Sequence, residues 1–311
     1  MPSSSQLKID GVVPVLPAPF APDETIDLGS IQKLIDFAIK SKCAGVCLPA
    51  YSTEFYKLDM EERYALVDAA VKASQGRIPV IGQSNHISSK LAAEIAKKNE
   101  ALGVDAISIA IPRLFAIPDD DIFQFLGKVM EAVTLPVLVQ DFNPGGMTVS
   151  ATFVKRLADT YSNFRYLKLE EPLMAPKVEQ IVDLTNGSIG VLEGWGGMYL
   201  LENIPAGVCG AMPGMGLADI LQKAYEVTKN GDGDAGMDLF EKVLPHIVFS
   251  LQNLELFLYM DKDLLVRRNL LTHSTVRSAT LTPDAGTLHH ADWLTQRVLR
   301  VIDEFQTDQT S

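Results

Sequence analysis

The sequence repeats one pattern eight times, a short apolar run followed by a stretch with the spacing of an amphipathic helix. The runs that we expect to form strands are residues 11–16, 44–49, 78–83, 104–111, 137–140, 166–170, 189–193 and 207–212. Apolar strands separated by helices indicate parallel strands that are buried on both faces. Eight such units in succession predict a (β/α)8 barrel rather than an open doubly wound sheet.

The segments between these runs have the spacing and the caps of helices. We expect helices over residues 28–41, 59–74, 88–102, 119–133, 150–160, 176–184 and 199–204. Asp59 with Glu62 three residues later forms a typical capping box, and Ser88 is a second expected cap. Residues 1–216 are therefore expected to form the barrel.

The pattern changes after the eighth run. From about residue 217 the sequence holds no strand signal, and amphipathic stretches cover residues 235–260, 261–272 and 291–305. We expect residues 217–311 to supply the last barrel helix and a helical extension packed on the barrel, as one structural unit. A barrel with such an extension accounts for all 311 residues without a second domain.

Charge and composition exclude several classes of function. The chain has 27 basic and 39 acidic residues, a net charge of −12, and no basic stripe, so we expect no binding to nucleic acid or to a membrane. No Gly-x-Gly-x-x-Gly or Walker-type loop follows the first run, which counts against nucleotide binding. We therefore expect no cofactor.

The amino-terminal residues and the cysteines bear on the compartment. The polar start lacks the charged-then-apolar layout of a signal peptide, and no stretch is long and unbroken enough to span a membrane. Cys43, Cys47 and Cys209 form neither a disulfide framework nor a metal-binding spacing. We interpret them as small buried residues of a cytoplasmic protein without a metal site.

The sixth apolar run carries one lysine, Lys168, between Leu167 and Leu169. Because side chains alternate along a strand, the leucines share one face and Lys168 takes the other face together with Tyr166 and Glu170. With the leucines packed under helices, Lys168 points into the barrel. Active sites of such barrels form at the carboxyl ends of the strands, where a confined amine can attack a carbonyl.

The sequence resembles the dihydrodipicolinate synthase/N-acetylneuraminate lyase family of class I aldolases. The Gly-Ile-Lys-Glu motif of the family is similar to residues 166–170, and its Gly-Thr-Thr-Gly-Glu loop is similar to residues 50–54, where only Glu54 is identical. Its Gly-x-x-Gly pattern matches residues 207–210. The resemblance implies a (β/α)8 fold, an imine on Lys168, and a homo-oligomer, either a dimer or a tetramer.

The departures from the family pattern concern the substrate. Gln140 stands where family members that condense pyruvate with an aldehyde carry a tyrosine, and glutamine cannot exchange a proton near neutral pH. Arg113 and Leu114 replace the paired tyrosines, and residues 143–146 lack the expected arginine. The segments around Gln140 and Glu193 are more similar to the branch that contains L-2-keto-3-deoxyarabonate dehydratase and related sugar-acid dehydratases.

Within this resemblance the residues at the strand ends receive expected roles. Lys168, Ser52 and Tyr51 are the catalytic candidates; Ser52 alternatively closes a simple turn, and Tyr51 alternatively forms a wall. Arg113 is expected either to clamp a distal carboxylate or hydroxyls of the substrate or to pair with an acid across a subunit contact. Asp141, Glu170 and Glu193 are candidates for the general base or for holding Lys168 in position. The substrate-binding candidates are Thr53, Arg113, Gln140, Asp141, Glu170, Glu193, Gly194 and Met212.

The expected partner is a small 2-oxo acid. We expect a Schiff-base-forming lyase that acts on pyruvate or on a 2-keto-3-deoxy sugar acid, with dehydration favoured because the tyrosine is absent. One alternative is a pyruvate-dependent aldolase or synthase, such as 4-hydroxy-tetrahydrodipicolinate synthase or an enzyme like N-acetylneuraminate lyase. A second is a barrel that binds a 2-oxo acid without turnover.

Overall fold

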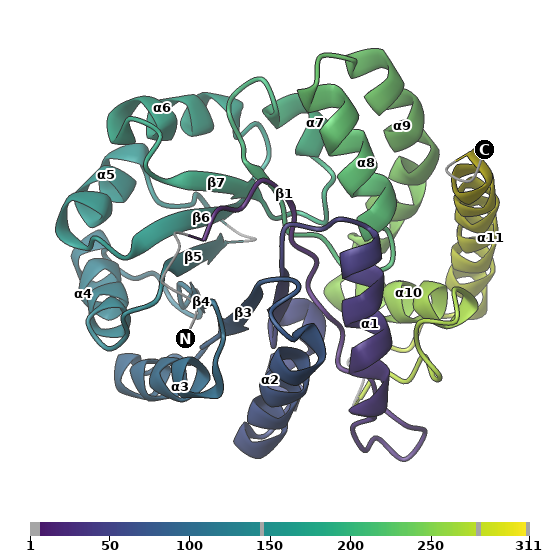
Figure 1. Cartoon of the computed structure of the whole chain (residues 1–311), viewed down its shortest axis with the longest axis horizontal. Helices are drawn as coiled ribbons and strands as arrows, with labels where there is room; N and C mark the ends of the chain where they lie inside the picture. Colours follow the sequence, from purple (N-terminus) through teal and green to yellow (C-terminus); the bar gives the residue numbers. More distant parts are fainter. Residues whose placement is uncertain (1–6, 144–145, 278–280, 309–311) are drawn as a thin grey trace.

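The chain folds into an eight-stranded parallel barrel surrounded by helices (Figure 1). The computed structural model describes residues 7–143, 146–277 and 281–308. Within them the strands are β1 (Gly11–Val12), β2 (Val46–Leu48), β3 (Val80–Gln83), β4 (Ala106–Ala110), β5 (Val137–Phe142), β6 (Phe164–Glu170), β7 (Gly190–Glu193) and β8 (Gly210–Ala211). Each strand from β2 to β8 pairs in parallel with the next, and β8 pairs with β1, as the sequence pattern predicts.

The segment that follows β1 closes the ring. A parallel bridge joins Val15 to Cys47, and the Cys47 N–H donates to Pro14 O over 3.0 Å. The first strand is shorter than its apolar run because Pro14 has no N–H to donate. Gly210, at a φ of +148°, lets β8 approach β1, since a Cβ there would lie 1.8 Å from Gly11 O.

The barrel helices follow the expected segments closely. They are α1 (Gly29–Lys40), α2 (Met60–Ser74), α3 (Ser89–Leu102), α4 (Asp119–Met130), α5 (Ala151–Thr160), α6 (Ala175–Thr185), α7 (Leu200–Asn203) and α8 (Ala218–Lys229). Asp59 and Glu62 form the expected capping box of α2 over 2.8 and 3.0 Å, whereas the Ser88 side chain makes no capping hydrogen bond. The capping box fixes where the chain turns from the loop after β2 into α2.

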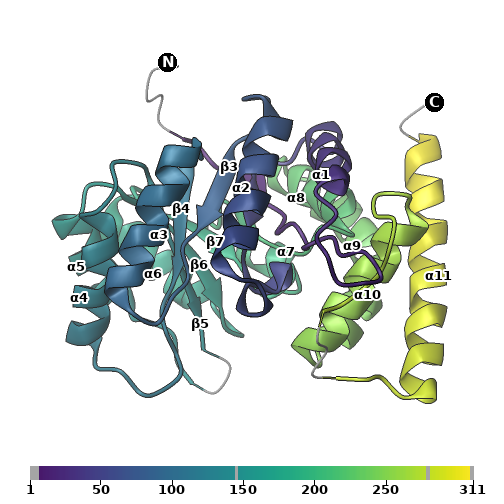
Figure 2. The same cartoon turned by 90° about the horizontal axis from the view of Figure 1, so that it is seen from below.

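Two hydrophobic layers place the strand residues. The barrel interior holds Val13, Cys47, Ile81, Ala106, Leu138, Tyr166, Leu192 and Met212, while Leu167 and Leu169 belong to the outer layer with the helices. The alternation along β6 is therefore confirmed, and Lys168 faces inward. At the amino end of the barrel, the Tyr166 hydroxyl donates to Leu7 O over 2.7 Å and accepts from Ile9 N–H over 2.9 Å. This segment lies at the amino end of the barrel, opposite the end where β5 terminates (Figure 2).

The helical extension comprises α9 (Gly233–Ser250), α10 (Leu254–Arg267) and α11 (Ala285–Asp308), with α11 outermost (Figure 2). The expected helix boundary at residue 260 is wrong. The Asn253 side chain accepts from the N–H groups of Glu255 and Leu256 over 2.8 and 3.4 Å, so a new helix starts there. Asp261 lies inside α10, where its carboxylate accepts from Gly216 N–H over 2.8 Å.

The helices of the described ranges include none with the length and apolar character that a membrane crossing requires.

Candidate active site

A cavity of about 250 Å³ lies at the carboxyl ends of the strands. The strands contribute Gln140, Phe142, Lys168 and Glu170 to its lining, and the loop after β2 contributes Tyr51 and Ser52. The remaining lining residues are Gly194, Trp195, Gly196, Met212, Pro213, Gly214, Leu251, Gln252, Asn253, Leu254 and Phe257. The cavity thus collects most of the candidates expected from the sequence.

Lys168 and Glu170 form the charged centre of the cavity. Both side chains are about 6% exposed, and Lys168 Nζ lies 2.8 Å from Glu170 Oε1. They can meet because both occupy the inward face of β6, two residues apart. The cavity therefore presents an amine and a carboxylate side by side.

Two glutamines hold Glu170 in place. Gln140, which is in register with Lys168, donates from Nε2 to Glu170 Oε1 over 2.8 Å. Gln83 Nε2 in turn donates to Gln140 Oε1 over 2.7 Å. Because these bonds use both ends of the Gln140 amide, its orientation is fixed and its donor points at the carboxylate. Gln140, which stands where family members carry a tyrosine, thus holds Glu170 in position.

Burial governs the protonation of Glu170. Removal from water raises the pKa of its carboxyl, while Lys168 and the hydrogen bond from Gln140 act in the opposite direction. Gly194 packs directly on this pair, since a Cβ there would lie 2.4 Å from Glu170 Cγ and 2.7 Å from Lys168 Cε. Any side chain at residue 194 would displace the pair.

The loop after β2 forms a second wall. Tyr51 and Ser52 belong to a short 3-10 turn, Tyr51–Thr53. The Tyr51 ring packs 5.4 Å from that of Phe142, which lies 5.6 Å from the Trp195 ring. Burial raises the pKa of the Tyr51 hydroxyl, and the Glu170 carboxylate adds to the effect. Tyr51 therefore stays protonated and can donate a hydrogen bond.

Thr53 and Glu54 lie beneath this wall, outside the cavity lining. The Thr53 hydroxyl donates to Leu16 O over 2.6 Å and accepts from Ala50 N–H over 2.9 Å, which fixes the turn below Ser52. The fully buried Glu54 pairs with Lys262 of α10 and with Lys57. Both residues therefore hold the loop that carries Tyr51 and Ser52.

Arg113 and Asp141 bind each other rather than facing the cavity. Arg113 Nε and Nη2 donate to the two carboxylate oxygens of Asp141 over 3.0 and 2.7 Å. Asp141 is in register with Leu169 of the outer layer, and it also accepts from Val149 N–H over 2.7 Å. Neither side chain is among those that line the cavity. Their contacts hold the segment that follows β5.

Glu193 is buried at the end of β7, outside the lining. Its Oε1 accepts from Trp195 N–H over 2.9 Å and from Tyr199 N–H over 3.4 Å. Oε2 has no hydrogen-bond partner among the described residues. Burial raises the pKa of this carboxyl to about 7. Glu193 thus shapes the turn that places Gly194 and Trp195 beside Lys168.

Two features of the site were not expected from the sequence. One is the contact of Gln83, which lies outside the cavity lining, with Gln140, 57 positions away. The other is the α9–α10 corner, residues 251–254, which lines the cavity with Phe257. The only local indication of this corner in the sequence is Asn253, because asparagine favours the start of a helix. The apolar spacing runs through this point without a break and therefore does not indicate a new helix.

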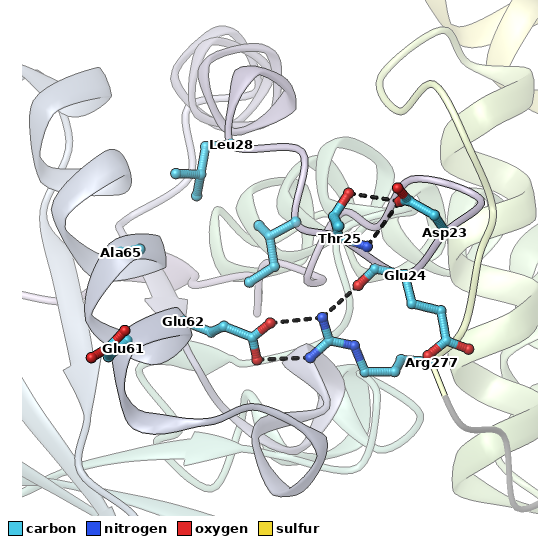
Figure 3. A pocket seen from close by; sticks show the side chains of 9 residues that line it. Asp23, Glu24, Thr25, Leu28, Glu61, Glu62, Ala65 and Arg277 are labelled. Carbon is cyan, nitrogen blue, oxygen red and sulfur yellow. Dashed lines mark hydrogen bonds and ion pairs between the residues drawn. The ribbon is translucent and has the colours of Figure 1, made fainter.

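A second hollow, of about 380 Å³, lies between the loop after β1, α2 and Arg277 (Figure 3). Asp23, Glu24, Glu61 and Glu62 are among the nine residues that line it. Arg277 donates to both carboxylate oxygens of Glu62 over 2.7 Å, so its charge is already paired. This hollow contains none of the catalytic candidates.

A cavity with a buried lysine at the carboxyl ends of the strands is typical of barrel enzymes, and comparison with known proteins supplies the family. The pattern of the dihydrodipicolinate synthetase family matches residues 8–302. The chain therefore belongs to the dihydrodipicolinate synthetase family.

Individual relatives agree with this assignment. L-2-keto-3-deoxyarabonate dehydratase of Azospirillum brasilense is 31% identical over 252 residues, which cover 79% of this chain and 81% of that protein. The dihydrodipicolinate synthase of Rhodopseudomonas palustris superimposes with a TM-score of 0.87 at 24% identity, over 94% of this chain and 98% of that one. YagE from Escherichia coli K12, solved in complex with pyruvate, gives 0.84 at 21% identity, over 94% and 98%. The last two share the fold.

Proposed function

We propose that the chain binds a 2-oxo acid as an imine on Lys168 and dehydrates a 2-keto-3-deoxy sugar acid. The observation that carries this proposal is the buried contact of 2.8 Å between Lys168 Nζ and Glu170 Oε1 inside the cavity. The amine attacks the C2 carbonyl of the substrate, and water leaves as the imine forms. The protonated imine then withdraws electrons from C3, so that a C3 proton becomes removable.

Glu170 is the proposed proton carrier. Attack requires the neutral amine, and one proton moved from Lys168 to Glu170 produces it while neutralising both buried groups. The burial that raises the Glu170 pKa favours this transfer. After imine formation the ionised Glu170 takes a proton from C3 and returns it to the C4 hydroxyl, which leaves as water.

The remaining site residues position the substrate. The carboxylate of the substrate rests against the Ser52 hydroxyl and backbone N–H, and Tyr51 donates to an oxygen near the reacting carbons. Gly194 and Met212 form walls. Thr53 supports Ser52, and Glu193, Arg113 and Asp141 act through the loops they hold. In this assignment Gln140 binds Glu170 and keeps it beside Lys168.

Dehydration is favoured over aldol cleavage by Gln140 and by the Azospirillum brasilense relative. Both ends of the Gln140 amide are committed to hydrogen bonds, so it carries no proton to or from an aldehyde oxygen. The Azospirillum brasilense relative is named as a dehydratase of L-2-keto-3-deoxyarabonate. YagE, which was solved with pyruvate, is named as a putative 2-dehydro-3-deoxy-D-gluconate aldolase and supports the aldolase alternative. Both names agree with a 2-oxo acid as the ligand.

Trapping the imine tests the proposal. The protein is incubated with pyruvate or with a 2-keto-3-deoxypentonate, reduced with borohydride, and mapped by mass spectrometry. We expect an adduct on Lys168, none in Lys168→Ala, and an unchanged adduct in the control Lys177→Ala, whose lysine pairs with Glu171 outside the cavity. Absence of any adduct in the parent protein would overturn the proposal.

Turnover of the pentonate separates the alternatives. Loss of water without release of pyruvate identifies the dehydratase. Release of pyruvate and an aldehyde identifies an aldolase instead, and an adduct without either product identifies a binding protein.

We further propose that the protein forms a homo-oligomer through the loops after β3 to β6. Leu114 and Phe115 are 66% and 82% exposed, Leu173 is 85% exposed, and Ile87 and Met147 are exposed as well. Large apolar side chains gathered on neighbouring loops are typical of protein–protein contacts. A second copy of this chain is the partner that the family resemblance favours.

A further inference from the structure

The helical extension brings one polar side chain without a hydrogen-bond partner in the described ranges to the cavity, that of Gln252. Of the extension residues that line it, Leu251, Leu254 and Phe257 are apolar, and the Asn253 oxygen caps α10. The exposed Gln252 makes no side-chain hydrogen bond within the described ranges. Its amide offers both a donor and an acceptor to a ligand.

The corner holds Gln252 in a fixed place. On one side Leu251 packs against Gly196, where a Cβ would lie 2.9 Å from Leu251 Cδ1. On the other side α10 begins at its Asn253 cap, and Glu255 binds Lys57 and Tyr56, each over 2.7 Å. These buried bonds join the corner to the loop that carries Tyr51 and Ser52. The backbone of Gln252 is therefore fixed in advance of binding, so a contact costs the ordering of its side chain alone.

The charges of the cavity restrict the substrate. Among its lining residues Lys168 is the only cation, and Glu170 is its partner. Arg113, the other cation expected near the strand ends, is paired with Asp141 outside the lining. A second carboxylate at the far end of a substrate would therefore enter a partly dry cavity without a counter-ion, which is unfavourable.

We propose that Gln252 is a specificity-determining residue, which hydrogen-bonds the distal hydroxyl of a 2-oxo acid that has one carboxylate and a neutral tail. This inference rests on the proposed function, because the imine on Lys168 fixes the other end of the substrate. A glutamine accepts from and donates to hydroxyl groups equally well, whereas it cannot neutralise a carboxylate. Pyruvate has no tail and does not reach this contact.

The test measures borohydride trapping on Lys168 against the concentration of three probes: pyruvate, a 2-keto-3-deoxypentonate and 2-oxoglutarate. In Gln252→Ala we expect the half-saturating concentration of the pentonate to rise about fivefold to tenfold, the value of one hydrogen bond. The half-saturating concentration of pyruvate should change by less than about twofold, because pyruvate does not reach Gln252 and loses no hydrogen bond. Gln296→Ala, a glutamine of α11 bonded to Asp292 on the surface, is the matched control and should change neither.

A gain of binding completes the test. Gln252→Lys supplies the missing cation, so trapping of 2-oxoglutarate should improve at least fivefold over the parent protein, by the same reasoning on a charged contact. Equal changes for pyruvate and the pentonate, or no change for either, would overturn the assignment of Gln252. Failure of the parent protein to trap pyruvate would overturn the proposed function and this inference together.

Discussion

Glu54 and Lys262 form a buried ion pair although 208 positions separate them in the sequence. Their side chains are 0% and 1% exposed. Lys57 joins them, with its Nζ 3.1 Å from Glu54 and 2.7 Å from Glu255. Four charged groups from the loop after β2 and from α10 thus meet at the edge of the cavity. The catalytic wall and the helical extension are joined by this cluster.

Removal of Lys262 should destabilise the protein. Lys262→Met leaves Glu54 buried with Lys57 as its remaining charged partner, so we expect a loss of about 3 kcal/mol in the free energy of unfolding. Urea unfolding measures the loss, with Lys242→Met on the exposed side of α9 as control. Equal unfolding midpoints for the two variants would show that the cluster adds nothing to stability.

Replacement of Glu170 should slow both turnover and imine formation. Glu170→Gln keeps the size of the side chain but cannot carry a proton, so we expect kcat to fall by about 10²–10⁴-fold. Borohydride should trap pyruvate on Lys168 more slowly than in the parent protein, because Glu170 is the proposed acceptor of the Lys168 proton. Glu171→Gln is the matched control, because Glu171 binds Lys177 and Thr148 away from the cavity. A Glu170→Gln enzyme with the parent kcat would remove Glu170 from the mechanism.

Glu193 should make stability depend on pH. Its pKa is about 7 in the folded chain against an ordinary value of 4.5, so the folded state holds this proton more tightly between these pH values. The contribution of Glu193 is therefore most favourable below pH 4.5 and is lost as the pH rises through 7. The full difference corresponds to about 3 kcal/mol.

The variant that checks this dependence is Glu193→Gln, which keeps an oxygen to accept from Trp195 N–H. Relative to the parent protein, Glu193→Gln should gain stability between pH 5 and pH 8 by about 2.5 kcal/mol, because it has no proton to lose. Chemical unfolding at several pH values gives the comparison. Parallel stability curves for the two proteins would contradict it.

Disruption of the apolar loops should dissociate the proposed oligomer. Phe115→Asp puts a charge into a contact that would bury an aromatic ring, and burial of an unpaired charge is strongly unfavourable. Light scattering coupled to size-exclusion chromatography should report a smaller particle. The control is Trp293→Asp on α11, since Trp293 is half exposed on the helical extension. An unchanged mass for Phe115→Asp would place the contact elsewhere.

The features that the sequence predicts well are those set by local periodicity. The order of the strands and the inward direction of Lys168 follow from the alternation along β6, where Leu167 and Leu169 require the helix side. The same alternation places Gln140, which is in register with Lys168, on the inward face of β5, and Asp141, in register with Leu169, on the outward face. Those two residues nevertheless entered the sequence prediction with the same role, because the end of the apolar run does not show where the strand stops.

The features that could not be predicted depend on pairings between distant segments. Arg113 was expected to bind a substrate or an acid across a subunit contact, whereas it pairs with Asp141 of the same chain. This pairing depends on the loop after β4 lying beside the end of β5. The α9–α10 corner reaches the cavity because α10 is attached to the loop after β2 through Glu255 and Lys262. The periodicity of apolar residues within one segment does not predict which distant segment its charged side chains will contact.

The hydrogen bonds of Leu7 and Ile9 with the Tyr166 hydroxyl have a kinetic consequence for the proposed reaction. Because this segment lies at the amino end of the barrel, we expect substrate and product to use the same opening at the carboxyl end, where the cavity lies. The product must dissociate before the next substrate molecule can bind, so their binding is mutually exclusive. Product inhibition should therefore be competitive, and the rate of product release sets an upper limit on kcat.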